Sequence, residues 1–523
     1  MTLLSLLLLP QAAHACGGMF CDAVIPVDQA AERIVFTLDG TTVVTEVQIT
    51  YQGQDDDFAW IVPVPAEPEL FISNDALFTR LANATVPTYT LQTDNEGGGS
   101  IGCNQDYNLQ KGGFDAASDS DGVSVVSEGT VGPYDTVVLQ AENADTLVAW
   151  LQDQGYSLPD DLEVVLDPYV STGQYFVALK LSSDKDTGDL APLGMRYAGT
   201  AASIPIQLTS IATIPDLPIE VFVLGSARAV PDNYLHVQIN EAAIDWLNGA
   251  TNYRAVVARA VDEAGGQAFA TDFSGSTDLM ANSIWTDGVV NLASLAATTD
   301  PIQWLEAIVY SGIAPSSQLN ALLVRYVPAP AGVDDATFLA CPSCYQGQVN
   351  APDFDPVVAT HAFDLEIVKV LMGQQARIDG ATQLTRLFTT MDAEEMTADP
   401  IFVLNADIEQ DISATHTATD HTRTAVFSGK TQARTLELAD GREFVFSDPS
   451  DTTAMQAVNS PDALVIEDLS ATGEGTVMFD GTEDAQADAD AFSAGCASDE
   501  AGAIAIPALL VLTAALRRRR RTA

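Results

Sequence analysis

The sequence predicts an α+β fold, with a β-rich N-terminal domain, a mixed α/β middle region and a mixed C-terminal region. Two kinds of local pattern indicate this class. Residues 32–51 alternate apolar and polar side chains, as strands do, whereas residues 141–155 repeat apolar side chains at helical spacing. The chain has 523 residues and is 47% apolar, enough for about two to four domains with substantial cores.

A β-hairpin is the first element that the sequence predicts. Apolar side chains occupy alternate positions on both sides of Asp39-Gly40, for example Ile34 and Phe36 before it and Val47 after it. Asp-Gly is a preferred pair for a tight turn between antiparallel strands. We therefore expect a hairpin with one buried face.

Prolines and glycines delimit the elements that follow. Pro63, Pro65 and Pro68 cannot donate backbone hydrogen bonds, so the apolar strand that contains them should lie at a sheet edge or end there. The stretch "DALFTRLANAT" is typical of a short helix. Residues 93–122 are rich in Gly, Asp, Ser and Asn and predict an acidic linker.

The middle region mixes helical and strand patterns. Leu147, Trp150 and Leu151 share one face of a predicted helix that Gly155 should end. Strands are predicted in "GQYFVALKLS", "ASIPIQLTSIA" and "IEVFVLGSA", and helices in "NEAAIDWL" and "TNYRAVVARAVDEAGG".

The C-terminal region is also mixed. Helices are predicted around "FDLEIVKVLMG" and "ATQLTRLFTTMDAEEM", and a β-rich stretch around "TLELADGREFVF". The predicted order is a signal peptide, a β-rich domain, the linker, the mixed middle region, a C-terminal region with a C-x-x-C pair, an Asp/Ala/Ser-rich spacer and a tail. These segments are residues 1–15, 16–92, 93–122, 123–330, 331–480, 481–500 and 501–523.

The chain is strongly acidic, with a formal net charge of −50. Five of its 22 basic residues lie in one run near the C-terminus. Such a surface repels nucleic acid phosphates and anionic lipid, so we predict no nucleic acid partner. It could gather divalent cations or basic partners, or serve only as a solvated acidic surface.

The N-terminus resembles a signal peptide. A short apolar segment, residues 3–10, precedes Ala13 and Ala15, the small-x-small pattern of a signal-peptidase site. The segment is too short to span a bilayer and lacks a basic residue before its leucines. Cleavage after Ala15 would leave Cys16 first, but Ala13 and His14 depart from a lipoprotein signal.

The C-terminus carries an apolar stretch followed by arginines. Residues 501–516 would cover roughly 24 Å as a helix, slightly short of a hydrocarbon core. The order of Cys496, apolar stretch and arginine cluster resembles the myxobacterial C-terminal sorting signal (MYXO-CTERM). That resemblance implies processing at Cys496, loss of the helix and display on the outer surface, whereas the alternative is a permanent membrane anchor. The cluster is Arg517, Arg518, Arg519, Arg520 and Arg521.

Four cysteines are candidates for disulfides: Cys16, Cys21, Cys341 and Cys344. Four cysteines allow three pairings, which the sequence does not distinguish. The "CPSC" pair could also exchange disulfides, but such a pair usually sits at a helix N-terminus with a low-pKa thiolate. A zinc site would need two further ligands. Structural disulfides are the default in an oxidising compartment.

Two further stretches have a partial metal-binding pattern. Asp119, Asp121, Gly122 and Glu128 match positions of a calcium loop, but its first position holds Ala117. "HTATDH", residues 416–421, offers two histidines and an aspartate in no standard spacing, within an expected polar loop. Acidic turns and loops are the simpler interpretation, so we assign no metal, cofactor or catalytic residue.

Several stretches together resemble a bacterial family known as domain of unknown function 2330. They include "ACGGMFC", "VDQAAERIVF", "QITYQGQDDDFAWIVPVP", "VGPYDTVVLQAENADTLVAWLQDQGY", "GQYFVALKL", "SIPIQLTSIA" and "LTRLFTTMDAEEMTADPIFVLN". The resemblance implies an exported or membrane-tethered protein with no established activity. It supplies no site residue.

Three functions therefore remain open. The first is an exported protein on the cell envelope, held at the outer-membrane surface through its tail or a lipid, that acts in envelope structure, adhesion or ligand binding without catalysis. The second is an extracellular hydrolase with an unrecognised carboxylate or metal site. The third is an envelope thiol-disulfide protein that uses Cys341 and Cys344.

Overall fold

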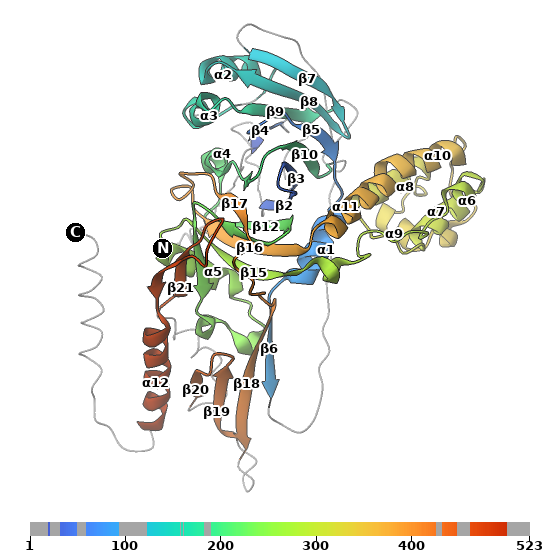
Figure 1. The fold of residues 1–523 in the computed structure, drawn as a ribbon. Coiled ribbons are helices and arrows are strands. Elements are labelled where there is room, and N and C mark those ends of the chain that lie inside the picture. Colours follow the sequence, from blue (N-terminus) through green and yellow to red (C-terminus); the bar gives the residue numbers. More distant parts are fainter. Residues whose placement is uncertain are drawn as a thin grey trace, which may run out of the picture.

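The computed structural model describes residues 19–20, 32–49, 59–93, 123–156, 158–159, 162–182, 190–424, 431–446 and 461–498. These residues form several sheets and helices, which confirms the predicted α+β class (Figure 1). None of the helices within these ranges is both long and apolar enough to cross a membrane. Residues 501–523 lie outside them.

A ten-stranded sheet forms the centre of the molecule. Its strands pair antiparallel except at β12–β2 and β14–β15, which are parallel. It draws strands from the predicted N-terminal, middle and C-terminal regions, so these regions share one sheet. In spatial order the strands are β22 (Thr476–Asp480), β21 (Ala463–Asp468), β14 (Leu235–Ile239), β15 (Ala268–Ser276), β16 (Gln383–Met391), β12 (Leu217–Gly225), β2 (Glu32–Leu38), β3 (Thr42–Gln48), β10 (Leu193–Ala198) and β5 (Glu69–Ile72).

The predicted hairpin is formed by β2 and β3. Its turn is closed by Asp39, whose Oδ1 accepts from the backbone nitrogens of Thr41 and Thr42 at 2.9 and 2.7 Å. Gly40 has a φ of +88°, a conformation that favours glycine. The expectation of one buried face was wrong, because Val35 is fully buried on the face opposite Phe36. The central position of β2 in the sheet explains this difference.

A five-stranded antiparallel sheet packs over one face of the large sheet. In order it contains β1 (Met19–Phe20), β4 (Ala59–Val64), β9 (Tyr175–Leu181), β8 (Tyr134–Ala141) and β7 (Val123–Val131). Beyond its two residue pairs with β1, β4 has β9 as its only described neighbour. Pro63 lies in that part of β4, as its missing donor requires.

Helices α2 (Ala144–Asp153) and α3 (Leu162–Ser171) cover the outer face of the five-stranded sheet (Figure 1). Leu147, Trp150 and Leu151 are buried there, as predicted from their spacing. Asn143 caps α2 by accepting from the Thr146 nitrogen, and Gly155, with a φ of +74°, follows its end.

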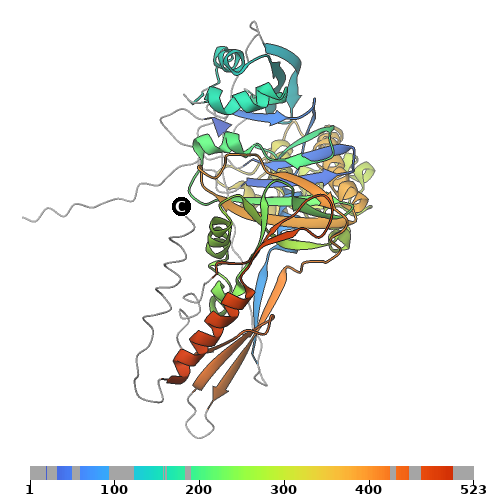
Figure 2. The same ribbon diagram turned by 60° about the vertical axis from the view of Figure 1, so that its left-hand side comes forward.

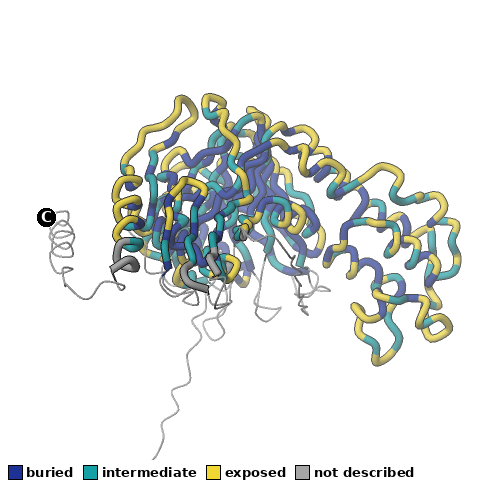
Figure 3. Tube along the Cα trace, turned by 90° about the horizontal axis from the view of Figure 1, so that it is seen from below, coloured by how far each residue is buried: buried dark blue, intermediate teal, exposed yellow. Residues whose placement is uncertain are grey.

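Helices also cover part of the opposite face of the large sheet and project from it as an arm. The set is α1 (Asp75–Thr85), α6 (Leu292–Ala296), α7 (Pro301–Val309), α8 (Ser317–Tyr326), α9 (Asp335–Ala340), α10 (Pro356–Phe363) and α11 (Lys369–Gly380), the last two joined by a π-helical turn at Asp364–Val368. Their core includes Val35 and Phe222 from the sheet. In Figure 3 the buried residues are concentrated in the body of the molecule, and exposed residues follow the outer side of this arm.

Two smaller sheets complete the fold. One contains β11 (Ala202–Ser203), β17 (Ile401–Asn405) and β13 (Arg228–Pro231). The other contains β20 (Glu443–Phe446), β19 (Thr431–Leu438), β18 (Thr415–Thr424) and β6 (Thr88–Thr93). Helix α12 (Thr482–Ser498) packs against β20 and occupies most of the predicted spacer (Figure 2). Helix α5 (Tyr253–Glu263) packs on β14 and β16.

Four further local predictions were wrong. "ASIPIQLTSIA" is strand only at Ala202–Ser203 and then helical at α4 (Ile206–Thr209) and a 3₁₀ turn, because Pro205 lacks an N–H group and fits a helix start. "NEAAIDWL" forms two 3₁₀ turns, separated by an extended Ile244. "HTATDH" lies in strand β18, and "ATQLTRLFTTM" lies largely in strand β16, not in a loop and a helix.

Candidate ligand-binding pocket between two sheets

The predicted site residues fall in different parts of the molecule. Cys341 and Cys344 are joined by a disulfide within the helical arm. Cys496 lies near the end of α12. Cys16, Cys21 and the arginine cluster Arg517–Arg521 lie outside the described residues, so their predicted roles stay predictions.

The C-x-x-C pair follows the C-terminal end of α9. The Cys341 nitrogen donates to the Phe338 carbonyl at 3.2 Å, and Cys344 is exposed. The negative end of a helix dipole disfavours a thiolate. This position therefore suits a structural disulfide better than thiol exchange.

The histidines of "HTATDH" are separately paired along β18. His416 Nδ1 lies 2.6 Å from Glu241 Oε1, and His421 Nε2 lies 2.9 Å from Glu437 Oε2. No cluster of three or more potential metal ligands occurs among the described residues. Of the calcium-loop residues only Glu128 is described, and it lies on β7.

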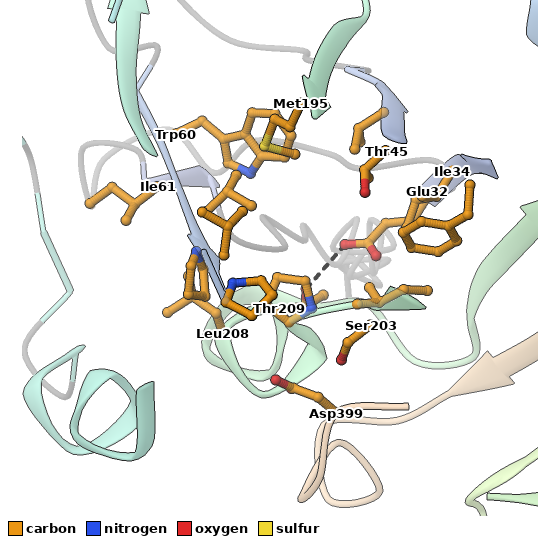
Figure 4. Close-up of a pocket in the computed structure, with 18 of the residues that line it drawn as sticks. Glu32, Ile34, Thr45, Trp60, Ile61, Met195, Ser203, Leu208, Thr209 and Asp399 are labelled. Atoms are coloured by element: carbon orange, nitrogen blue, oxygen red, sulfur yellow. Dashed lines mark hydrogen bonds between the residues drawn. The ribbon is translucent and has the colours of Figure 1, made fainter. Parts of the chain in front are cut away.

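A pocket lies between the ten-stranded sheet and the five-stranded sheet (Figure 4). Its cavity volume is about 120 Å³, and the wider space up to its mouth, open solvent included, is about 950 Å³. Its walls are mostly apolar, because the alternation of β2, β3, β10 and β4 directs side chains of both sheets into the same space. The apolar lining includes Ile34, Phe36, Val47, Trp60, Val62, Met195, Tyr197 and Leu208.

Polar groups gather at one side of this pocket. Glu32 is only 8% exposed, and its Oε1 accepts a hydrogen bond from the Thr209 hydroxyl at 3.0 Å. Figure 4 shows this pair facing the cavity from β2 and α4, away from Trp60 and Met195. The hydroxyl groups of Thr45 and Tyr197, which also line the pocket from the large sheet, are hydrogen-bonded to each other at 3.2 Å.

Asp399 adds a second carboxyl group near this side of the pocket. It accepts from the Tyr169 hydroxyl at 2.9 Å and from the Gln207 nitrogen at 3.1 Å. Burial raises the pKa of Asp399, whereas these hydrogen bonds act in the opposite direction. The arrangement offers an apolar space with the carboxyl groups of buried Glu32 and half-buried Asp399 at one side, which suits an apolar molecule bearing a hydrogen-bond donor.

Sequence reasoning identified none of these pocket residues as a site. One usable signal was present, because Glu32 is in phase with Ile34 and Phe36 and must share their buried face. An acidic side chain in phase with a strand's core residues is costly unless it is paired. Asp399 gave no such signal, since it comes from a distant part of the chain.

Fold and pocket thus define an α+β protein with an apolar cavity between stacked sheets. Residues 10–302 match the family model for domain of unknown function 2330 (DUF2330), described as an uncharacterized protein conserved in bacteria. The chain belongs to this family. The comparisons with curated proteins and with solved structures find no match.

Proposed function

We propose that this protein is an exported, envelope-attached binding protein whose pocket takes a small apolar molecule with a cationic or hydrogen-bond-donating head group. The observation that carries the binding role is the apolar space between β2, β3, β10 and β4, with Glu32 and Asp399 at one side. The signal-peptide pattern and the C-terminal tail support the location.

The apolar walls and the carboxyl groups of the pocket favour a ligand with an apolar part and a polar head group. The apolar walls favour hydrocarbon, at about 0.8 kcal/mol for each buried methylene. The buried carboxylate of Glu32 accepts hydrogen bonds, so a head group that donates them is favoured. A charged donor forms the stronger contact, because charge-assisted hydrogen bonds are about twice as strong as neutral ones.

A homologous series of primary n-alkylamines tests this proposal. If the chain enters the pocket, each added methylene should tighten binding by up to about fourfold, until the space is filled. Calorimetry would measure affinity, and quenching of tryptophan fluorescence would report occupancy because Trp60 lines the pocket. An affinity that does not change with chain length would contradict a hydrocarbon site.

Variants separate the head group from the chain. Glu32→Gln should weaken alkylamine binding by about tenfold or more, but leave alkanol binding nearly unchanged. Glu142→Gln removes the same charge from an exposed position and is the matched control for non-specific attraction. Val47→Trp should block both series by filling the pocket, whereas Val164→Trp, at a residue that is 73% exposed, should not. Equal binding by Glu32→Gln and Glu142→Gln would rule out the head-group role.

A further inference from the structure

A second cavity lies between β14, β15 and the sheet that contains β6 and β18. Its lining comes from these strands, from β13, α5 and β21, and from the loop after β17. It is far more polar than the first pocket. Seven acidic side chains line it, among them Asp407, Glu409 and Glu474, which are exposed. A cavity with this lining attracts positive charge.

Arg228, on β13, is an unusual member of this lining. It is only 8% exposed, yet no carboxylate among the described residues lies within ion-pair distance of it. Its only hydrogen bond to a described residue is from Nη2 to the Thr271 hydroxyl, at 3.3 Å. Its Nε has no partner in the described structure. A buried cation without a counter-ion in direct contact is costly.

The polar groups of the cavity nearest to Arg228 form hydrogen bonds with one another. The Thr271 hydroxyl, which accepts the hydrogen bond from Arg228, also lies 3.0 Å from His236 Nε2. His236 Nδ1 in turn lies 3.0 Å from Glu467 Oε2. Burial lowers the pKa of His236, which favours the neutral ring. Donation can then run from Arg228 to Thr271, from Thr271 to His236 and from His236 to Glu467. Glu467 keeps its negative charge and attracts Arg228 through space, but Thr271 and His236 lie between them, so the guanidinium has no carboxylate in direct contact.

The charges that line the cavity indicate which charges a ligand should carry. A simple anion would pair with Arg228 but would be repelled by the carboxylates around it. A simple cation would suit those carboxylates but would leave Arg228 unpaired. A molecule with both charges satisfies both requirements, because a carboxylate can bridge two N–H groups of a guanidinium while an ammonium group faces the acidic rim.

We propose that this cavity is a binding site for a small zwitterion, an amino acid or a short peptide, whose carboxylate pairs with Arg228 and whose ammonium group faces Asp407, Glu409 and Glu474. This site is separate from the apolar pocket and does not depend on its function. His236 and Thr271 act as positioning residues that hold the guanidinium.

Calorimetry on the full chain tests the proposal with defined probes. The probes are the twenty L-amino acids and alanyl-alanine, compared with acetate and ethylammonium at equal ionic strength. At least one zwitterion should bind about tenfold or more tightly than either singly charged probe. Acetate that binds as tightly as the best zwitterion, or no binding by any probe at millimolar concentration, would overturn the proposal.

Two variants test the role of Arg228. Arg228→Gln should weaken zwitterion binding by about thirtyfold or more, since it removes one partner of a buried charge pair. Its melting temperature without ligand, measured beside that of the wild type, shows whether the variant is folded under the conditions of the binding experiment. Arg254→Gln, at an exposed arginine outside the cavity, is the matched control and should bind normally.

Thr271→Val provides an independent check should Arg228→Gln fold poorly. It removes the hydroxyl that holds the guanidinium and should weaken zwitterion binding while leaving alkylamine binding in the apolar pocket unchanged. Unchanged zwitterion affinity in both Arg228→Gln and Thr271→Val would overturn the assignment.

Discussion

At the residue scale, the most distinctive feature is a row of charged side chains across the central strands of the large sheet. Arg33 Nε lies 2.9 Å from Glu220 Oε2, and Arg386 Nη2 lies 2.9 Å from Glu220 Oε1. Arg386 Nε also lies 3.0 Å from Asp272 Oδ2, an ion contact without hydrogen-bond alignment. The Tyr253 hydroxyl donates to Asp272. The charges therefore alternate in sign from β2 to β15.

Asp272 should make stability depend on pH in an unusual direction. Burial raises its pKa to about 6 from an ordinary value of 3.8, against the attraction of Arg386 and the hydrogen bond from Tyr253. Between these two values the folded state holds more protons than the unfolded state, so stability falls as pH rises. Relative to Asp272→Asn, the wild type should lose up to about 3 kcal/mol of unfolding free energy between pH 4 and pH 7.

Urea denaturation across that pH range would measure this difference. The exposed Asp278→Asn is the control and should differ from the wild type by no more than about 0.5 kcal/mol throughout. A wild type that gains stability over Asp272→Asn as pH rises would show that Asp272 is charged and well paired at all these pH values.

At the element scale, the sequence predicted most elements whose apolar residues have one period and one buried face. Helices α1, α2 and α5 are examples, whereas the hairpin β2–β3 was predicted from its alternation and its Asp39-Gly40 turn although both faces of β2 are buried. It failed at β16, where Leu384, Leu387, Phe388 and Met391 follow helical spacing although the segment is a strand. This strand lies between β12 and β15, and both of its faces are buried by packing above and below the sheet, so apolar residues occur on either side and imitate a helix.

The prediction of the candidate pocket was limited by a different cause, the dependence of the site on contacts between distant parts of the chain. Glu32 could be placed on the buried face of its strand from its phase with Ile34. The contacts of Trp60 and Met195 across the pocket depend on how two sheets stack, and Arg228 is unusual only because of partners that it lacks in three dimensions. Local patterns carry no information on such distant pairings.

Strand β10 contains a glycine that the packing requires. A Cβ atom on Gly194 would lie 2.2 Å from the Phe71 ring, and Arg377 lies over that ring at 5.5 Å from its centroid. The ring must shift to admit a methyl group and would lose its packing against Arg377 and Gly194, so Gly194→Ala should destabilise the protein by about 1–3 kcal/mol. Gly129→Ala, in β7 with nothing within 4 Å, should stay within about 1 kcal/mol of the wild type.

Denaturation midpoints of the two glycine variants would provide the comparison. Both positions lie in strands and neither has a positive φ, so backbone strain does not separate them. If Gly194→Ala were as stable as Gly129→Ala, the close approach of Phe71 would not be a constraint.

At the scale of the whole molecule, charge is divided unevenly along the chain. The acidic residues are spread through it, whereas five of the 22 basic residues lie at Arg517–Arg521. A retained tail would place this cluster on the cytoplasmic side of a membrane, by the positive-inside rule. A processed tail would release a body more acidic than the full chain, at a surface where negative charge resists association with anionic lipid.

The ends of the mature protein distinguish these outcomes. If the proposed processing occurs, peptide mass spectrometry of surface-exposed protein should find Cys16 as the first residue and no peptide that contains Arg517. Cys496→Ser should retain the C-terminal tail and lower the amount of protein at the surface. Ser498→Ala, a nearby change in the same helix, is the matched control and should be processed normally. Recovery of Arg517 from surface-exposed wild-type protein would instead establish a permanent anchor.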